Sequence, residues 1–542
     1  MITLGVHIGH DAAVAVFVDG VLRFAEEEER HTHHKAQAGC PWLAIDAALV
    51  AVDARDADVT TIALTWSIER YVECRRTLAE HARSVGNVAW YDKRQREIAT
   101  VHEAIAALRV RFSKAAIVDF AHHHAHLACA VFFGGPRDAT PTPGPVLGVV
   151  ADALGDAEAL TVFRAPSAEA LISAPEVIER SSPFDSIGFF YKRAAEQFGF
   201  SGREACGYLM ALSGCADGRD LVTGDELAGF DPFAARSFPA AVAARLGLDR
   251  PDADFLSRAR EANAIQRITE TYLTSRFTSL IDAHRPSTIY VSGGVSLNCV
   301  ALARLAAAFP TTRLVACAVK KDSGTAVGAA LLAIGTRALR DGARSRTLRL
   351  GTPITGEERP FAAQRRLLRD DLARALIDDL THDRIVALVD GGGELGPRAL
   401  GARSILARAN SPAIARELNA RVKQRFEFQP FAGAFLDGEL AQISDEYMSY
   451  AVRFDTRPPH LEGILHRDDS TRAQIVSPNE HSVMRDVLVE LRRRGEPAVV
   501  LNTSLNARGE PMPRTAADVI AAVAKLGLDA IYTPLGRLSC RP

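Results

Sequence analysis

The chain has 542 residues, of which 47% are hydrophobic and 24% are charged, and its formal net charge is -2 at pH 7. This balance excludes a disordered chain, and the near-neutral charge excludes an overall basic field for nucleic acid. The eight cysteines form no CxxC pair, which argues against a disulfide scaffold or a zinc ribbon. We therefore expect two unequal globular domains and no nucleic-acid partner.

The N-terminal residues show no basic segment followed by an apolar core, as a secretory signal would require. No uncharged run approaches the roughly 18 residues of a membrane span. These features predict a soluble, cytoplasmic protein with no membrane partner.

Strand and helix patterns alternate along the first part of the chain, with an Asp19-Gly20 turn after the opening hairpin. The expected strands span residues 2–8, 13–18, 62–66, 115–120, 146–150, 159–163 and 288–292, and the helices include 41–52 and 261–282. The alternation predicts an α/β fold whose sheets are covered by helices.

An arginine-rich stretch without periodicity runs from about residue 336 to about residue 366, and we place the linker there. A second α/β pattern follows it. Its expected strands are 385–389, 474–476 and 498–501, and its helices are 413–422, 483–494 and 516–526. No internal sequence repeat is visible.

Four histidines within five residues follow the expected strand 115–120. His122 and His126 lie four apart in an apolar helical stretch, so both imidazoles face one side of the helix. Two such imidazoles bind a divalent ion when a carboxylate joins them, and Asp152 and Asp322 are the candidates at strand or helix edges. The set suits Fe(II), Mn(II) or Zn(II). The alternative is a cluster of solvated or capping histidines.

Glycine-bearing turns after the expected strands, at residues 9–11, 152–156 and 292–298, let backbone amides approach phosphates. In the second domain, residues 394–404 place two arginines, which match phosphate oxygens bidentately, around glycine turns. Residues 501–506 lie at the end of an expected strand and carry a dense set of neutral side chains that can form hydrogen bonds. The alternative for the glycine turns and for residues 501–506 is that they are ordinary turns. The alternative for the two arginines is that they lie on the surface, which is a serious alternative because this chain uses Arg far more often than Lys.

Together these motifs resemble the O-carbamoyltransferases of nodulation and antibiotic biosynthesis. The resemblance covers nearly the whole chain and keeps motif order through His10-Asp11, Glu28-Glu29-Arg30, the histidines, Gly293-Gly294, Asp322-Ser323-Gly324, Gly396 to Ser404 and Asn502 to Asn506. It implies an actin-like ATPase (ASKHA) two-lobed domain at residues 1–350, a linker at 351–366 and a YrdC-like α/β domain at 367–542.

The resemblance also implies two half-reactions. The YrdC-like domain converts carbamoyl phosphate and ATP, with Mg(II), to carbamoyl adenylate, and the N-terminal domain transfers the carbamoyl group to a small-molecule alcohol. Because the adenylate hydrolyses readily, it is expected to travel inside the protein. The acceptor is expected to be a secondary metabolite, and the oligomeric state stays open.

Residue roles follow from the same resemblance. The residues expected to hold the phosphates, and to fix nucleotide or carbamoyl groups, are Arg398, Arg403, Lys423, Asn502 and Ser504. The metal, with Fe(II) favoured, is expected on His122, His126, Asp152 and Asp322, and the nucleotide beside Gly293, Gly294 and Asn298. His10 is the expected general base for the acceptor hydroxyl, with Asp11 beside it, because a histidine pKa lies near working pH.

The chain departs from the family pattern at two places. Tyr208 stands where a cation is usual, and Phe426 and Gln429 replace an expected glutamate and arginine, which puts phosphate contacts there in doubt. Two alternatives stay open: a nucleotide-dependent kinase on the actin-like fold, and a catalytically silent nucleotide-binding homologue.

Overall fold

The computed structural model describes residues 1–134, 144–216, 229–234, 236–250, 253–339, 347–442 and 444–540. The chain forms two compact units. Unit 1 comprises Met1–Glu28 and Ala36–Arg346, and unit 2 comprises Glu29–Lys35 and Thr347–Pro542. Both contain mixed sheets and helices, so the predicted α/β class is confirmed. Within the described residues, every helix is too short or too polar to cross a membrane.

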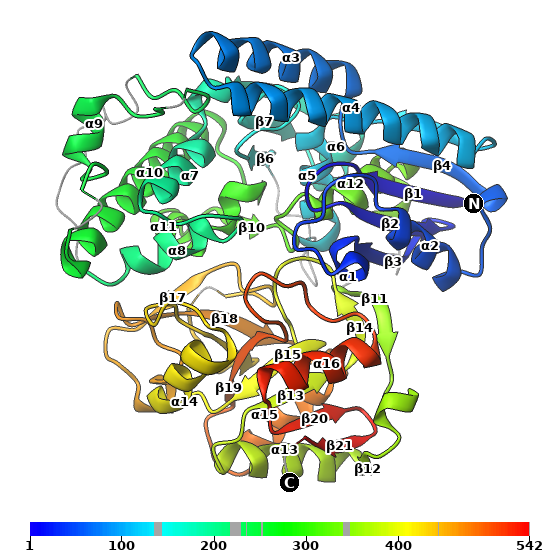
Figure 1. Ribbon diagram of the computed structural model, residues 1–542, viewed down its shortest axis with the longest axis vertical. Helices are drawn as coiled ribbons and strands as arrows, with labels where there is room; N and C mark the ends of the chain where they lie inside the picture. The colour runs from blue at the N-terminus through cyan, green and yellow to red at the C-terminus, as the bar shows by residue number, and fades with distance from the viewer. Residues whose placement is uncertain are drawn as a thin grey trace. The chain divides into compact units, whose positions relative to one another are not determined.

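The first sheet of unit 1 carries the N-terminal hairpin (Figure 1). Its strand order is β3(Val21–Glu27)-β2(Ala13–Val18)-β1(Ile2–His7)-β4(Val59–Leu64)-β5(Ala116–Asp119). β1 pairs antiparallel with β2 and parallel with β4, and β2 turns into β3 through Asp19 and Gly20, both at positive φ. The helices that follow its strands are α2(Trp42–Ala51), α3(Ile68–Ser84), α4(Val88–Arg111) and α5(His122–Gly134).

The second sheet of unit 1 repeats the topology of the first. Its order is β10(Arg313–Ala316)-β9(Thr288–Ser292)-β6(Val146–Ala151)-β7(Leu160–Ala165)-β8(Glu176–Ser181). β6 to β8 form an antiparallel meander, and β9 and β10 add in parallel to β6, as β4 and β5 add to β1. Unit 1 is therefore a structural duplication without a visible sequence repeat.

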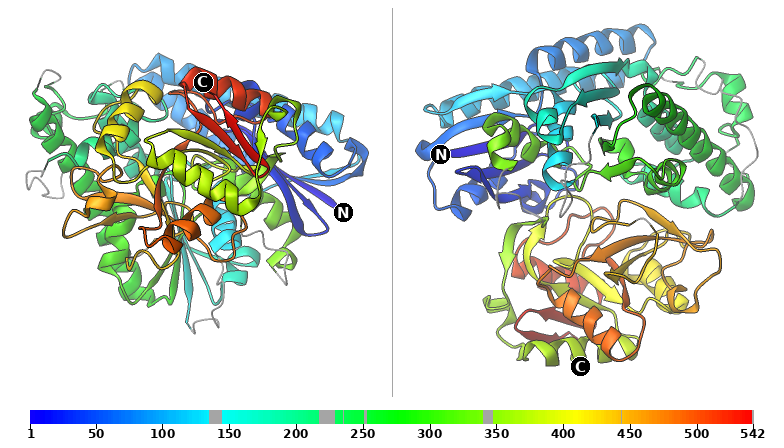
Figure 2. Two further views of the ribbon diagram at one scale, coloured as in Figure 1. Left: turned by 90° about the horizontal axis from the view of Figure 1, so that it is seen from below. Right: turned by 180° about the vertical axis from the view of Figure 1, so that it is seen from behind.

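The remaining helices of unit 1 are α6(Ala168–Ser173), α7(Ile187–Gln197), α8(Ala205–Ser213), α9(Ala240–Arg245), α10(Phe255–His284), α11(Cys299–Ala308) and α12(Ser323–Ile334). Figure 2 shows the long helix α10 in green in the view from behind. α12 packs tightly on β1 and α5. A Cβ added at Gly5 would lie 1.8 Å from the Ala326 carbonyl oxygen, and one at Gly328 would lie 1.8 Å from the Ala125 oxygen. These glycines permit the close approach that brings the start of α12 beside the start of α5.

Unit 2 is built on a nine-stranded mixed sheet. Its order is β12(Arg365–Arg366)-β21(Gly536–Ser539)-β20(Ala530–Thr533)-β13(Val386–Val389)-β15(Arg403–Ala407)-β19(Val499–Ser504)-β16(Ala432–Leu436)-β18(Ser470–Val476)-β17(Ala451–Arg453), and β11(Arg349–Ile354) pairs separately with β14(Gly391–Glu394). Its helices are α1(Glu29–Thr32), α13(Arg369–Thr381), α14(Pro412–Glu417), α15(Val483–Arg493) and α16(Ala516–Leu526). The expected linker, residues 351–366, thus supplies strand residues to unit 2.

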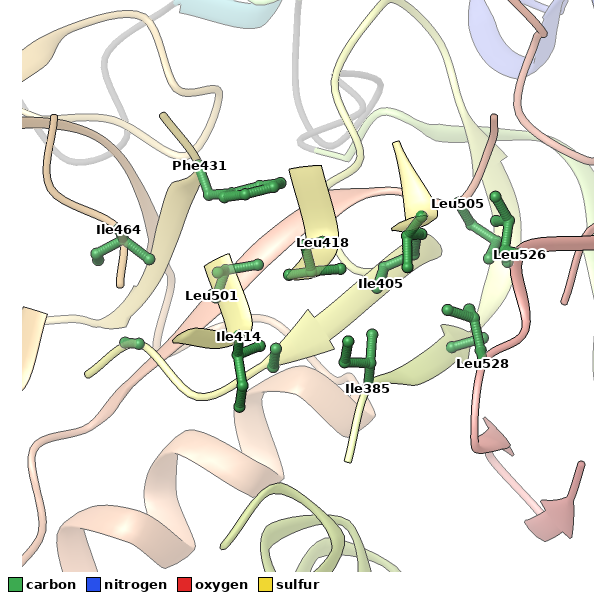
Figure 3. Packing of buried hydrophobic residues seen from close by; sticks show 14 of the residues in the cluster. Ile385, Ile405, Ile414, Leu418, Phe431, Ile464, Leu501, Leu505, Leu526 and Leu528 are labelled. Carbon is green, nitrogen blue, oxygen red and sulfur yellow. The ribbon is translucent and has the colours of Figure 1, made fainter. Parts of the chain in front are cut away.

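Hydrophobic side chains cover both faces of this sheet, because successive strand residues point to opposite sides. Ile385 and Ile405 pack on one face with residues from α14 and α16, while Leu388 and Leu406 pack on the other with α13 and α15. Figure 3 shows the first cluster, with Leu501 among its side chains. The rigid sheet fixes the ends of its strands, where the polar motifs of this unit lie.

Candidate functional site

Four predicted ligands meet in unit 1. The side chains of His122, His126, Asp152 and Asp322 each offer one atom, and these atoms all lie within 4.8 Å of one another. The imidazoles come from the first two turns of α5. Asp152 directly follows β6, and Asp322 directly precedes α12. The structure therefore brings together the set that the HxxxH spacing and the two edge carboxylates predicted.

The inward atoms of this cluster lack hydrogen-bond partners of good geometry. His122 Nε2, His126 Nε2 and Asp152 Oδ2 are all buried and unsatisfied, although His126 Nε2 lies 3.3 Å from Asp152 Oδ2. His122 Nδ1 lies 3.2 Å from the Thr65 carbonyl oxygen, which fixes the tautomer that leaves Nε2 as an acceptor. Buried unsatisfied polar atoms are costly, so their convergence makes this cluster a candidate cation site.

The charges at the cluster favour a cation too. Burial by itself would lower the pKa of His126, but close contacts with Asp152 and Asp322 and the negative charges of these carboxylates raise it to about 10. Burial would raise the pKa of Asp152, yet contacts with the two imidazoles of His122 and His126 hold it well below its usual range. A proton on His126 and a divalent ion are alternative ways to neutralise the same two carboxylates.

His10 lies at the rim of this cluster and is about half exposed. Its Nδ1 lies 3.3 Å from Asp11 Oδ2 and 3.5 Å from Asp322 Oδ2. Asp11 is buried in a left-handed conformation with φ of 58°, and its other oxygen accepts from Lys321 Nζ at 2.9 Å. Backbone conformations of this kind concentrate at functional sites. Both carboxylate contacts of the imidazole are therefore made by Nδ1, with Asp11 and Asp322.

The predicted nucleotide turn lies beside the cluster of His122, His126, Asp152 and Asp322. Gly293 has φ of 88°, and a Cβ there would meet the Ala151 carbonyl oxygen, while a Cβ at Gly294 would approach Asp152 Oδ1. Asn298 caps α11 through Ala301 N and exchanges hydrogen bonds with Gln266. The side chain of Asn298 is thus engaged in the fold, whereas Gly294 passes close to Asp152, one of the four candidate metal ligands.

In unit 2, several predicted residues meet at the ends of strands. Lys423 Nζ donates to Ser504 Oγ at 3.2 Å and to Asn506 Oδ1 at 2.9 Å. Asn502 lies two residues before Ser504 on the same face of β19, and its Nδ2 donates to the Ala399 carbonyl oxygen at 3.0 Å. The structure therefore connects Lys423 with Ser504, and Asn502 with the loop that carries Arg398.

Arg403 differs from the other predicted phosphate ligands. Its side chain is fully buried, and its guanidinium donates to four backbone carbonyl oxygens, those of Gly391, Ala402, Thr352 and Pro513. This pattern is typical of an arginine that holds loops together. Arg398 is half-buried and lies in the middle of the Gly396–Gly401 loop.

The three residues that depart from the family pattern differ in their contacts. Tyr208 is buried and its hydroxyl donates to a Glu204 carboxylate oxygen. Phe426 stacks on Phe428 with ring centroids 5.2 Å apart, and Gln429 Oε1 is buried without a hydrogen-bond partner.

Sequence reasoning missed residues that pack against the candidate metal site. Trp66 stacks on His122 with centroids 3.9 Å apart and an interplanar angle of 8°. His7 is buried, and its Nε2 lies 3.7 Å from Asp322 Oδ2. His123 and His124, expected to point elsewhere, do so, toward Thr161 and the Leu171 carbonyl oxygen. The sequence signal that could have identified His7 is its spacing of three residues from His10.

Comparison with known proteins shows that the C-terminal part is similar to one protein family. Residues 377–536 match the family model described as Carbamoyltransferase C-terminus. "Nodulation protein NolO" of Bradyrhizobium diazoefficiens is 28% identical over 46% of this chain and 49% of its own length. A 3'-hydroxymethylcephem-O-carbamoyltransferase of Streptomyces clavuligerus is 30% identical over 43% of this chain and 45% of that protein. The uncharacterized protein sll1178 of Synechocystis sp. is 25% identical over 96% of this chain and 93% of its own.

The matches to the first two of these relatives span about half of each relative's length. The similarity to the Synechocystis protein extends across both units. The predicted resemblance to the O-carbamoyltransferases of nodulation and antibiotic biosynthesis is thus confirmed.

Proposed function

We propose that this protein is an O-carbamoyltransferase that carbamoylates a hydroxyl of a small secondary metabolite. The observation that carries this proposal is the matched carbamoyltransferase C-terminal region, in a chain similar to a 3'-hydroxymethylcephem-O-carbamoyltransferase. Carbamoyl phosphate, water and ATP would give carbamoyl adenylate, phosphate and pyrophosphate. The acceptor oxygen would then bond to the carbamoyl carbon and AMP would leave.

We assign the first half-reaction to unit 2, as a YrdC-like domain. Arg398 and Lys423 would bind the phosphates of carbamoyl phosphate and ATP, and Asn502 and Ser504 would orient the polar groups. The Lys423–Ser504 contact and the tether of Asn502 to the Arg398 loop support a single site. Arg403 would shape this site rather than touch phosphate, because its donors point to carbonyl oxygens within the fold.

We assign the second half-reaction to unit 1, as an actin-like domain. The duplicated five-stranded topology supports this assignment. His122, His126, Asp152 and Asp322 would hold a divalent metal, with Fe(II) favoured over Mn(II) or Zn(II) by the resemblance. The metal would supply Lewis acidity toward the adenylate phosphate.

In the transfer step His10 would take the proton of the acceptor hydroxyl as its oxygen attacks. Asp11 and Asp322 flank His10 Nδ1, which supports this role because they leave the other nitrogen for the acceptor. Gly293 and Gly294 would let the nucleotide approach the backbone next to Asp152.

Two single variants test the division of labour. Arg398→Ala is expected to abolish pyrophosphate release from ATP and carbamoyl phosphate. His10→Ala is expected to keep pyrophosphate release and to form no carbamoylated product. The product is measured by mass spectrometry across candidate alcohols. Failure of both variants at pyrophosphate release would contradict the assignment.

The same assay separates the alternatives. A kinase on the actin-like fold would phosphorylate an alcohol and release ADP without needing carbamoyl phosphate. A silent homologue would release neither AMP nor pyrophosphate with any acceptor. The matched carbamoyltransferase region favours the transferase over both.

A further inference from the structure

The glycine-rich loop between β14 and β15 is organised by one carboxylate. Glu394 is buried, and its Oε1 accepts hydrogen bonds from Leu400 N at 2.7 Å, Ala402 N at 2.8 Å and Arg403 N at 3.2 Å. Three amides converging on one oxygen resemble the way a backbone nest holds an anion. Here the anion belongs to the chain itself, so the loop is shaped before any ligand arrives.

The loop has little intrinsic preference for its conformation. Gly396 and Gly401 have φ of 102° and 101°, in the region where glycine is favoured, and Pro397 lacks an amide donor. Glycines at both ends widen the range of conformations open to an untethered loop. Contacts from outside must therefore select the conformation.

Two side-chain amides add to the carboxylate. Asn502 Nδ2 donates to the Ala399 carbonyl oxygen, and Gln474 Nε2 donates to the Leu400 carbonyl oxygen at 3.1 Å. Glu394 and Asn502 thus bind the N–H and C=O sides of the same peptide, between residues 399 and 400. That peptide is fixed in two directions, one residue after Arg398.

We propose that Glu394 is a positioning residue, which sets the Gly396–Gly401 loop so that Arg398 presents its guanidinium to the phosphate of carbamoyl phosphate. This inference rests on the proposed function of unit 2 for its ligand. The loop geometry by itself depends only on the hydrogen bonds of Glu394. Since one oxygen accepts all three amides, a glutamine amide oxygen can replace it, whereas a methyl group cannot.

The test compares Glu394→Ala with Glu394→Gln in the full chain. Binding of carbamoyl phosphate is measured by calorimetry, and backbone exchange across residues 395–405 is measured by hydrogen–deuterium exchange. Glu394→Ala is expected to weaken the binding of carbamoyl phosphate about tenfold or more and to speed hydrogen exchange in the loop by at least the same factor. The reason is that the variant loses the hydrogen bonds that the loop amides donate to a charged acceptor. Glu394→Gln is expected to retain both properties to within about threefold.

Asp379→Asn is the matched control. Asp379 is also a buried carboxylate of unit 2, and it accepts from Tyr532, Arg384 and Arg537 without touching the loop. Its variant should lower the stability of unit 2 but leave binding and loop exchange unchanged. If Asp379→Asn weakens binding as much as Glu394→Ala, the positioning role is wrong and the effect is general destabilisation.

The two readouts separate this inference from the proposed function. Should wild-type protein bind no carbamoyl phosphate while Glu394→Ala still speeds loop exchange, the proposed ligand is wrong and the loop role stands. Unchanged exchange in Glu394→Ala, or a Glu394→Gln variant as impaired as Glu394→Ala, would overturn the positioning role.

Discussion

Replacing Asp152 with Asn tests the proposed metal site directly. Asp152 Oδ2 is a buried, unsatisfied atom that lies 3.3 Å from His126 Nε2 and 3.8 Å from His122 Nε2. The substitution keeps the shape of the side chain and removes one of two negative charges. Because changes even in the partners of metal ligands cost about 10–100-fold in affinity, loss of a charged ligand should cost about 100-fold or more.

The expected size in a stability assay follows from linkage. At a metal concentration about 100 times the wild-type Kd, binding stabilises the folded wild type by about 2.7 kcal/mol. A 100-fold weaker site under the same conditions gives only about 0.4 kcal/mol. Chemical denaturation with and without Mn(II) under anaerobic conditions, repeated with Fe(II), measures the difference.

The control is Asp254→Ala. Asp254 caps α10 by accepting from Leu256 N and Ser257 N, away from the cluster. Its loss should cost about 1 kcal/mol with and without metal, and leave the metal-induced increment intact. An Asp152→Asn protein that gains the full wild-type increment would refute the proposed coordination.

Three further predictions concern unit 2. Leu501→Ala should lower the free energy of unfolding by about 2–5 kcal/mol in urea denaturation, because it leaves a cavity at a fully buried position in the cluster of Figure 3. A loss below about 1 kcal/mol would contradict the packing. Arg403→Met should destabilise the fold by about 3 kcal/mol or more, because buried carbonyl oxygens lose their donors; retained stability with lost phosphate binding would restore the ligand role. Burial opposes ionisation of Asp379, but hydrogen bonds from Arg537 and Tyr532 lower its pKa below the usual value. Its contribution is therefore present above about pH 4 and is lost as pH falls through the folded pKa, so Asp379→Asn should flatten the acid side of the stability profile; an unchanged slope would contradict this.

Local patterns predicted much of unit 1 and its cluster. The alternating residues 2–8 and 13–18 predicted the opening hairpin, and the four-residue spacing of His122 and His126 placed both imidazoles on one face. The carboxylate partners could be proposed because Asp152 and Asp322 lie at the edges of elements. Their convergence depends on the glycine contacts of α12, which no local pattern reveals.

Other features depend on long-range packing and could not be predicted from the sequence. Arg398 and Arg403 look equivalent in a glycine-rich motif, yet β15 directs Arg403 into the interior, where carbonyl oxygens surround it. Residues 29–35 belong to unit 2. Within this segment Arg30 donates a hydrogen bond to the carbonyl oxygen of Glu394, which is more than 300 residues away in the sequence. The duplicated sheets likewise share a topology without sharing a visible pattern of residues.

The most direct test of the proposed activity is pyrophosphate release by the purified chain with ATP, Mg(II) and carbamoyl phosphate. The proposal predicts that pyrophosphate appears only when carbamoyl phosphate is present, and that the Arg398→Ala variant releases none. Absence of pyrophosphate from the wild-type protein, or release that does not need carbamoyl phosphate, would contradict the carbamoyl-adenylate account.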